Sequence, residues 1–208
     1  LERYNMATEK VKFGLSNIYF AERTGADEGE VTYKAPVKCP GAVNASISRN
    51  TDQNIFYADN KAYFVSNTKS SVEIELEVAD IAKELLTTFL GYIKSLNGSL
   101  LETNAAVTPS FAVLFQIETD NKARKICYYN CTAAESDEEY GTKEDTIDPT
   151  TSTLKVTCTG ETVGDYNVFR EIAYSGDKNY DTFFNTVKVP TSEQAQELSM
   201  DNPDKAVI

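Results

Sequence analysis

Apolar and polar residues alternate along most of this chain, and the alternation predicts a β-rich protein. The clearest stretch is residues 71–78, which includes Val72, Glu73, Ile74, Glu75, Leu76, Glu77 and Val78. Because successive strand side chains point to opposite faces, this stretch predicts a strand with one buried face and one row of carboxylates. Further strands are predicted over residues 13–20, 31–37, 42–49, 123–133 and 151–159, and a strand covered on both faces over Phe111–Thr119.

One segment changes to a helical period. Apolar residues recur at three- and four-residue spacing from Ile81 to Lys94, Asp80 is placed to cap the first turn, and Asn97-Gly98 is placed to end the helix. We therefore expect one helix over about residues 81–94 that packs on the sheet. The predicted fold class is mainly β, or β-rich α+β, with two packed antiparallel sheets or a partly closed barrel and one flanking α-helix.

An aromatic hairpin is predicted over residues 55–65. Asp59 and Asn60 suit a tight turn, because both side chains bond to the local backbone and Asn tolerates a positive φ angle. Aromatic residues flank this turn on both sides and suit a pleated, half-buried surface. They are Phe56, Tyr57, Tyr63 and Phe64.

A strongly acidic segment follows the strand that ends near Ala133. It contains seven acidic residues and one lysine, namely Glu135, Asp137, Glu138, Glu139, Lys143, Glu144, Asp145 and Asp148. Connections of this length without periodicity are usually functional or disordered. We predict that the segment contacts a neighbouring subunit and becomes ordered there.

Composition argues against enzymatic chemistry and against tight nucleic-acid binding. The chain has no histidine, the usual acid–base group near neutral pH, and no glycine-rich phosphate loop. Thirty-two acidic and 20 basic residues give a net charge of −12, which opposes the phosphate contacts that dominate nucleic-acid affinity. We expect no enzymatic activity, no cofactor and no metal. No apolar run approaches the roughly 18 residues of a membrane span, so no membrane contact is expected.

The four cysteines, Cys39, Cys127, Cys131 and Cys158, are predicted to be buried, reduced packing residues. Cys127 and Cys131 are four residues apart in a predicted strand, which places them on one face and about 13 Å apart, too far for a disulfide. The spacing of a zinc site is missing. The alternative, a disulfide, would join neighbouring strands through Cys158.

Four short motifs occur in order along the chain. They are PGAV at 40–43, IFYADNKAYFV at 55–65, CYYNCTA at 127–133 and GTKEDTIDPTT at 141–151. Together they resemble the major tail protein, or tail tube subunit, of long non-contractile-tailed phages that infect Gram-positive bacteria. The resemblance covers about residues 13–190, which is nearly the whole chain.

The resemblance implies a structural virion protein with a phage tail-tube-like fold. Its copies would assemble as stacked hexameric rings and form the channel for genome delivery. The implied partners are other copies of the chain, the tape-measure, tail-terminator and distal-tail proteins, and DNA that passes through without tight binding. The implied location is the virion tail, after assembly in the host cytoplasm. An anion-repelling wall requires an acidic strand face, so Glu73, Glu75 and Glu77 are the lumen-facing candidates.

One domain is expected over residues 6–190, with residues 1–5 as an extension before it and residues 191–208 as a polar C-terminal tail or arm. Two alternatives to a tube subunit stay open. The first is another tail ring protein, a distal-tail or terminator protein, whose assembly stops at one ring. The second is an adhesin-like β-sandwich that binds carbohydrate or protein through exposed tyrosines, for which the candidates are Tyr57, Tyr63, Tyr128 and Tyr129.

Overall fold

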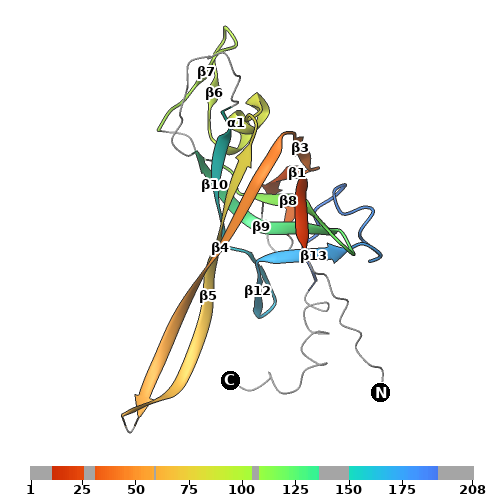
Figure 1. Ribbon diagram of the computed structural model, residues 1–208. Helices are drawn as coiled ribbons and strands as arrows, with labels where there is room; N and C mark the ends of the chain where they lie inside the picture. The colour runs from red at the N-terminus through yellow and green to blue at the C-terminus, as the bar shows by residue number, and fades with distance from the viewer. Residues whose placement is uncertain (1–10, 26–30, 59, 105–107, 136–149, 192–208) are drawn as a thin grey trace.

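The computed structural model describes residues 11–25, 31–58, 60–104, 108–135 and 150–191, and the account below concerns these residues. Antiparallel strands dominate them, as the alternation predicts, and one short helix, α1 (Lys83–Phe89), lies beside the sheet (Figure 1). No helix in these ranges is long and apolar enough to cross a membrane. The strands are β1 (Lys12–Thr24), β2 (Thr32–Tyr33), β3 (Val37–Cys39), β4 (Ala42–Ala58), β5 (Lys61–Val78), β6 (Ile93–Lys94), β7 (Leu100–Leu101), β8 (Phe111–Thr119), β9 (Arg124–Glu135), β10 (Ser152–Cys158), β11 (Glu161–Val163), β12 (Tyr166–Val168) and β13 (Arg170–Tyr174).

Nine of the described strands belong to one antiparallel sheet. Its order is β2-β1-β8-β9-β10-β5-β4, with β3 also paired to β1 and β13 also paired to β9. Strand β9 has β8 along one edge, while its other edge pairs with β13 over Arg124–Tyr128 and with β10 over Cys131–Glu135. The β-rich antiparallel class with a flanking helix is confirmed. Its layers are parts of one curved sheet that is not closed into a barrel.

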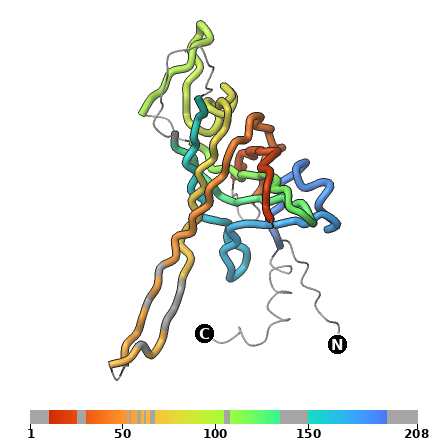
Figure 2. Tube along the Cα trace, viewed as in Figure 1, coloured from red at the N-terminus to blue at the C-terminus, as the bar shows by residue number. Residues whose placement is uncertain are grey.

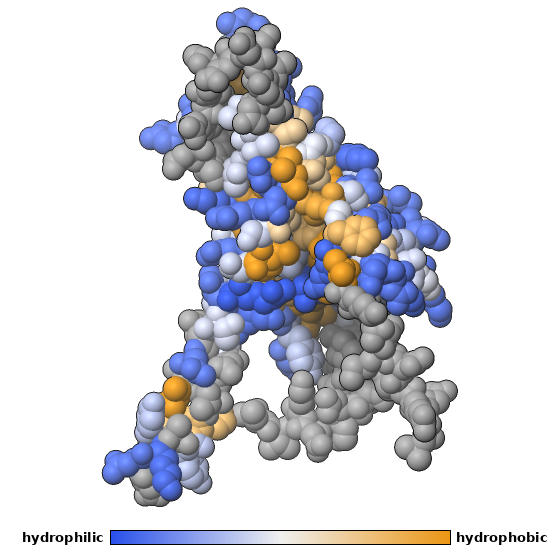
Figure 3. All heavy atoms as spheres, in the orientation of Figure 1, coloured by the Kyte–Doolittle hydropathy of each residue, from blue (hydrophilic) through white to orange (hydrophobic). Residues whose placement is uncertain are grey.

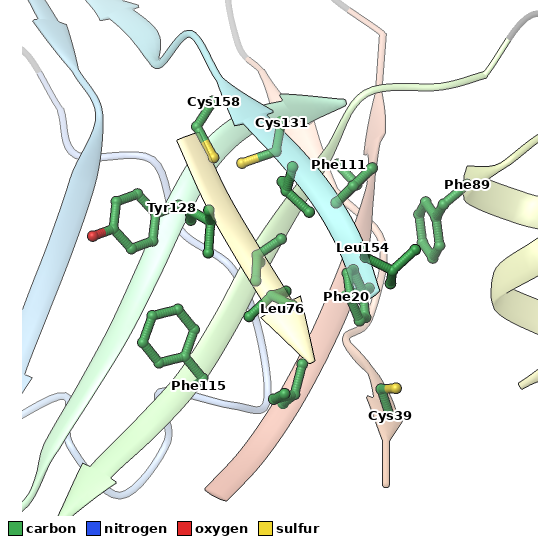
Figure 4. Packing of buried hydrophobic residues seen from close by; sticks show 14 of the residues in the cluster. Phe20, Cys39, Leu76, Phe89, Phe111, Phe115, Tyr128, Cys131, Leu154 and Cys158 are labelled. Carbon is green, nitrogen blue, oxygen red and sulfur yellow. The ribbon is translucent and has the colours of Figure 1, made fainter. Parts of the chain in front are cut away.

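Buried side chains form two clusters, one on each face of β8. Phe111, Val113 and Phe115 point into the larger cluster, and Ala112 and Leu114 point into the smaller one. The prediction that this strand is covered on both faces is therefore confirmed. The larger cluster also receives Val72, Ile74, Leu76 and Val78 from β5 and Leu154, Val156 and Cys158 from β10 (Figure 4).

The helix is shorter than the sequence predicts, so the expected range 81–94 is wrong. Gly91 takes a φ angle of 78°, which ends the helical backbone after Leu90, and Ile93–Lys94 then form β6. The Asp80 side chain accepts a bond from the backbone N–H of Ile81 at 2.9 Å and makes no helix cap. The helix still packs on the sheet as expected, since the Phe89 ring lies 4.8 Å from that of Phe111.

The four cysteines are buried free thiols, but Cys127 and Cys131 do not share a face as predicted. Between the pairs Phe111–Cys131 and Val113–Tyr128, two steps along β8 oppose three steps along β9. This extra residue is a β-bulge, and Asn130 adopts the positive φ angle of 49° within it. The bulge reverses the alternation, so Cys127 enters the smaller cluster and Cys131 the larger one.

The predicted strand 42–49, the aromatic hairpin and the strand 71–78 form one long element. Strands β4 and β5 pair from Ala42 and Val78 at the base to Ala58 and Lys61 at the end. The outer part of this hairpin, from the pair Thr51 and Lys69 to the turn, is called the arm below. Figure 2 shows that the arm projects far from the rest of the sheet. Asn60 takes a φ angle of 60°, which confirms the predicted left-handed turn residue.

Candidate functional site

The predicted carboxylate row lies on an open polar face of the sheet. Two rows of aligned residues cross β4, β5, β10 and β9 there: Ser46, Glu75, Lys155 and Ala134 in one, and Ser48, Glu73, Thr157 and Thr132 in the other. Glu77 and Thr153 form the next aligned pair. These ten residues are called the polar face below, and the core residues of the same strands point to the opposite side.

The polar face combines short side chains with an excess of negative charge. It has three carboxylates and one ammonium group, that of Lys155, which is aligned with Glu75. Asn50 donates a hydrogen bond to Glu73 at 2.8 Å, and Thr151 donates one to Glu77 at 2.6 Å. A shallow hollow of about 380 Å³ lies along this surface beside Glu73, Glu75 and Lys155. This arrangement of charges suits a surface that weakly repels anions rather than a site that binds a ligand tightly.

The aromatic residues of the predicted hairpin lie near the end of the arm and are exposed. The exposed fractions are 61% for Phe56, 64% for Tyr57, 75% for Tyr63 and 44% for Phe64. Together with the exposed Ile55 they are called the arm tip, and Figure 3 shows apolar atoms at the surface of the arm. The expectation of a half-buried aromatic surface is wrong for the subunit itself, because the arm projects beyond the body. Asp59 lies outside the described residues.

The acidic segment connects two neighbouring strands of the sheet. Glu135 ends β9 and is aligned with Leu154 of β10, so the chain leaves and returns at one edge of the polar face. The side chain of Glu135 and all of Asp137, Glu138, Glu139, Lys143, Glu144, Asp145 and Asp148 lie outside the described residues. Their predicted contact with a neighbouring subunit stays a prediction.

A buried ion pair joins the start of the chain to its later part. Arg23 in β1 donates two hydrogen bonds to Glu161 in β11, at 2.6 and 3.0 Å, and the Glu161 side chain is only 3% exposed. The hydroxyl of Tyr33 donates to Glu161 at 2.7 Å and accepts from the backbone N–H of Asn130 at 3.1 Å. The hydrogen bond to Glu161 raises the pKa of Arg23, and burial raises that of Tyr33, so both remain proton donors. Through Tyr33, this cluster also satisfies the backbone N–H of Asn130 in the β9 bulge.

Sequence reasoning missed this cluster because its partners are far apart in the chain. Alternation continued from Leu154, Val156 and Cys158 places Glu161 on the outward side. Gly160, with a φ angle of 79°, breaks that alternation and turns Glu161 inward. Gly160 itself was the one available signal in the sequence, because glycine adopts a left-handed backbone more readily than other residues.

A second hollow of about 770 Å³ lies between β9, β13 and the segment 179–190. Tyr129 is buried in its wall, with its hydroxyl 2.8 Å from Glu171 and 2.9 Å from the carbonyl oxygen of Lys188. Burial raises the pKa of Tyr129, so the phenol stays protonated and holds these elements together. Tyr128 is buried as well, so the expectation that both tyrosines line an exposed surface is wrong.

The described residues were also compared with the requirements of a metal site. Among the residues that the structure describes, no group of three or more Cys, Asp or Glu residues is arranged to hold a metal ion. The expected absence of a cofactor stays a prediction.

Comparison with known proteins gives the family. A family model described as phage tail tube protein matches residues 1–167, which is well over half of the 208-residue chain. No curated protein matches the chain. The matched range contains the arm and every residue of the polar face. The chain therefore belongs to the phage tail tube protein family, which is a family of structural tail proteins and not a class of enzymes.

Proposed function

We propose that this chain is the major tail tube subunit of a long non-contractile tail, that its copies form hexameric rings, and that the polar face of each copy lines the channel. The observation that carries this proposal is the polar face itself. Four neighbouring strands present two aligned rows of short polar and acidic side chains on the side opposite the main core.

A channel for DNA requires a wall that does not bind phosphate. Binding gains its free energy largely from Lys and Arg residues that release counterions from the phosphates. The polar face has one such residue, Lys155, and three carboxylates, so it opposes that gain. Its Ser, Thr and Ala side chains are short and offer no cation to a phosphate. DNA then passes without being held.

The arm tip supports self-assembly. Exposed apolar clusters on a subunit mark surfaces that are covered in the complete assembly. A patch at one end of an elongated subunit that binds a different surface on the next copy makes a head-to-tail contact, and such contacts build rings and open filaments. We assign the arm tip to a contact with a neighbouring copy in the tube. The tape-measure, tail-terminator and distal-tail proteins are the further partners proposed, with a Gram-positive host whose cytoplasm is the site of assembly.

Electron microscopy of the purified protein tests this function. We expect long tubes of constant diameter in negative stain at high protein concentration. Single rings that never elongate would instead identify a distal-tail or terminator ring. A monomer or trimer in size-exclusion chromatography at the same concentration would favour the adhesin-like alternative.

A further inference from the structure

Two of the four buried thiols lie directly opposite each other in the sheet. Cys131 of β9 is aligned with Cys158, the last residue of β10. The backbone N–H of Thr159 donates to the carbonyl oxygen of Asn130 at 3.0 Å, which makes the adjacent pair 130 and 159 a hydrogen-bonded one. Hydrogen-bonded and non-hydrogen-bonded pairs alternate along an antiparallel ladder, so Cys131 and Cys158 occupy a non-hydrogen-bonded pair.

This position brings the two sulfurs together. Non-hydrogen-bonded pairs have Cα atoms about 4.5 Å apart, within the range of about 4.4–6.8 Å that a disulfide bridges. The two sulfurs point toward each other within the larger core cluster (Figure 4), and both residues are 0% exposed. Burial, followed by the neighbouring thiol of Cys158, raises the pKa of Cys131. The Cys131 thiol therefore stays protonated, and the two sulfurs are already placed for a bond.

The other two cysteines have no such arrangement. Cys127 lies in the smaller cluster on the other side of the bulge, and Cys39 lies in β3. The bulge at Asn130 is what turns Cys131 toward Cys158, since uninterrupted alternation would place it with Cys127.

We propose that Cys131 and Cys158 form a site of oxidative modification, at which a small peroxide converts the thiol pair into a disulfide after the protein leaves the reducing cytoplasm. The first thiol releases its proton, and the thiolate attacks one oxygen of hydrogen peroxide. The O–O bond breaks, hydroxide leaves and takes up the released proton, and the products are a sulfenic acid and one water. The second sulfur then displaces the hydroxyl group of the sulfenic acid, which forms the S–S bond and a second water. The two thiols lose two electrons in all, and the peroxide gains them.

Both thiols are fully buried in the folded subunit. The oxidant therefore reaches them only during local opening of the sheet, which costs less free energy than global unfolding. The bond would close the connection between β9 and β10, which contains the acidic segment, and would fix two strands of the polar face. The inference concerns the subunit itself and does not depend on tube formation.

The full-length reduced protein, treated with hydrogen peroxide while folded, tests the proposal. Alkylation in denaturant should count two free thiols in place of four, and peptide mapping should find residues 131 and 158 in one cross-linked product. The melting temperature should rise by about 10 °C, because the bond closes a loop of intermediate length in the unfolded chain, and reductant should reverse the rise. Since the thiolate is the nucleophile and the pKa of Cys131 is raised, the reaction should be faster at pH 9 than at pH 7.

Two single variants separate this pair from general thiol oxidation. Cys127→Ala, a buried thiol on the other face, should keep the loss of two thiols and the rise in melting temperature. Cys158→Ala should abolish both. Four retained thiols after treatment of the folded wild type, or a map that joins residue 127 or two different molecules, would overturn the proposal. The map of the wild type decides the question even where Cys158→Ala fails to fold.

Discussion

At the scale of single residues, two ion pairs of nearly equal length contribute differently to the stability of the fold. Arg23 and Glu161 approach to 2.6 Å with the carboxylate almost fully buried, whereas Lys34 and Glu22 approach to 2.7 Å at the surface. A buried carboxylate that loses its partner keeps its full desolvation cost, while an exposed one is rehydrated. Tyr33 adds a second bond to the buried carboxylate and also satisfies the Asn130 backbone. The buried pair is thus the one that the fold depends on.

Removing each cation in turn tests this difference. We expect Arg23→Met to lower the free energy of unfolding by about 3 kcal/mol, because it leaves Glu161 buried with Tyr33 as its remaining donor. The matched change Lys34→Met should cost no more than about 0.5 kcal/mol. Urea denaturation of the subunit, followed by circular dichroism, measures both. Equal costs for the two variants would contradict the assignment.

At the scale of elements, alternation predicts strands well and their ends poorly. The buried residues of β5 and β10 and the double burial of β8 follow from local pattern, because each depends only on the order of apolar residues. The end of α1 and the reversal of faces in β9 depend instead on the backbone at Gly91 and Asn130. One residue with a positive φ angle determines where the helix ends, and another determines where the faces of β9 reverse. The pattern of apolar residues does not reveal such backbone angles.

The arm supplies a prediction at the same scale. Tyr57 and Tyr63 are the most exposed aromatic residues of the arm tip. The double variant Tyr57→Ser, Tyr63→Ser should leave the melting temperature of the subunit within about 2 °C of the wild type, since exposed side chains contribute little to stability. It should abolish tubes in negative stain, because the contact with the neighbouring copy loses its apolar area.

Tyr166→Ser is the control for the arm variant. Tyr166 is also an exposed tyrosine, but it lies in β12, away from the arm. Tubes should form normally from this variant. Normal tubes from the double arm variant would show that the arm tip is not an assembly contact.

At the scale of the whole molecule, the polar face and the core are two sides of the same strands. The hairpin of β4 and β5 and the later strands β9 and β10 align their polar side chains, and their apolar residues meet on the opposite side. The sequence predicts that Glu73, Glu75 and Glu77 share a face, since alternation is local. It does not predict the neighbours Lys155 and Thr132, because register between distant strands is set by tertiary packing.

Charge reversal on this face tests the channel directly. In the triple variant Glu73→Lys, Glu75→Lys, Glu77→Lys, each subunit presents cations where the wild type presents carboxylates. If the face lines the lumen, tubes of normal length should form, but phage particles should release DNA slowly or incompletely. Each new phosphate contact adds about 0.9 to the slope of log affinity against log salt, so high salt should relieve the defect. The measurement is the rate and extent of DNA release at several salt concentrations.

A second triple variant separates position from net charge. Glu102→Lys, Asp165→Lys, Asp181→Lys changes the charge of the subunit equally, at exposed residues outside the polar face, and should release DNA at the wild-type rate. If the polar-face variant also releases DNA normally, the face lies on the tube exterior. If it forms no tubes, while the control variant does, the face is a contact between subunits. A defect that is confined to the polar-face variant and disappears at high salt fits only a face that DNA passes, because long-range repulsion from net charge alone would affect both variants alike.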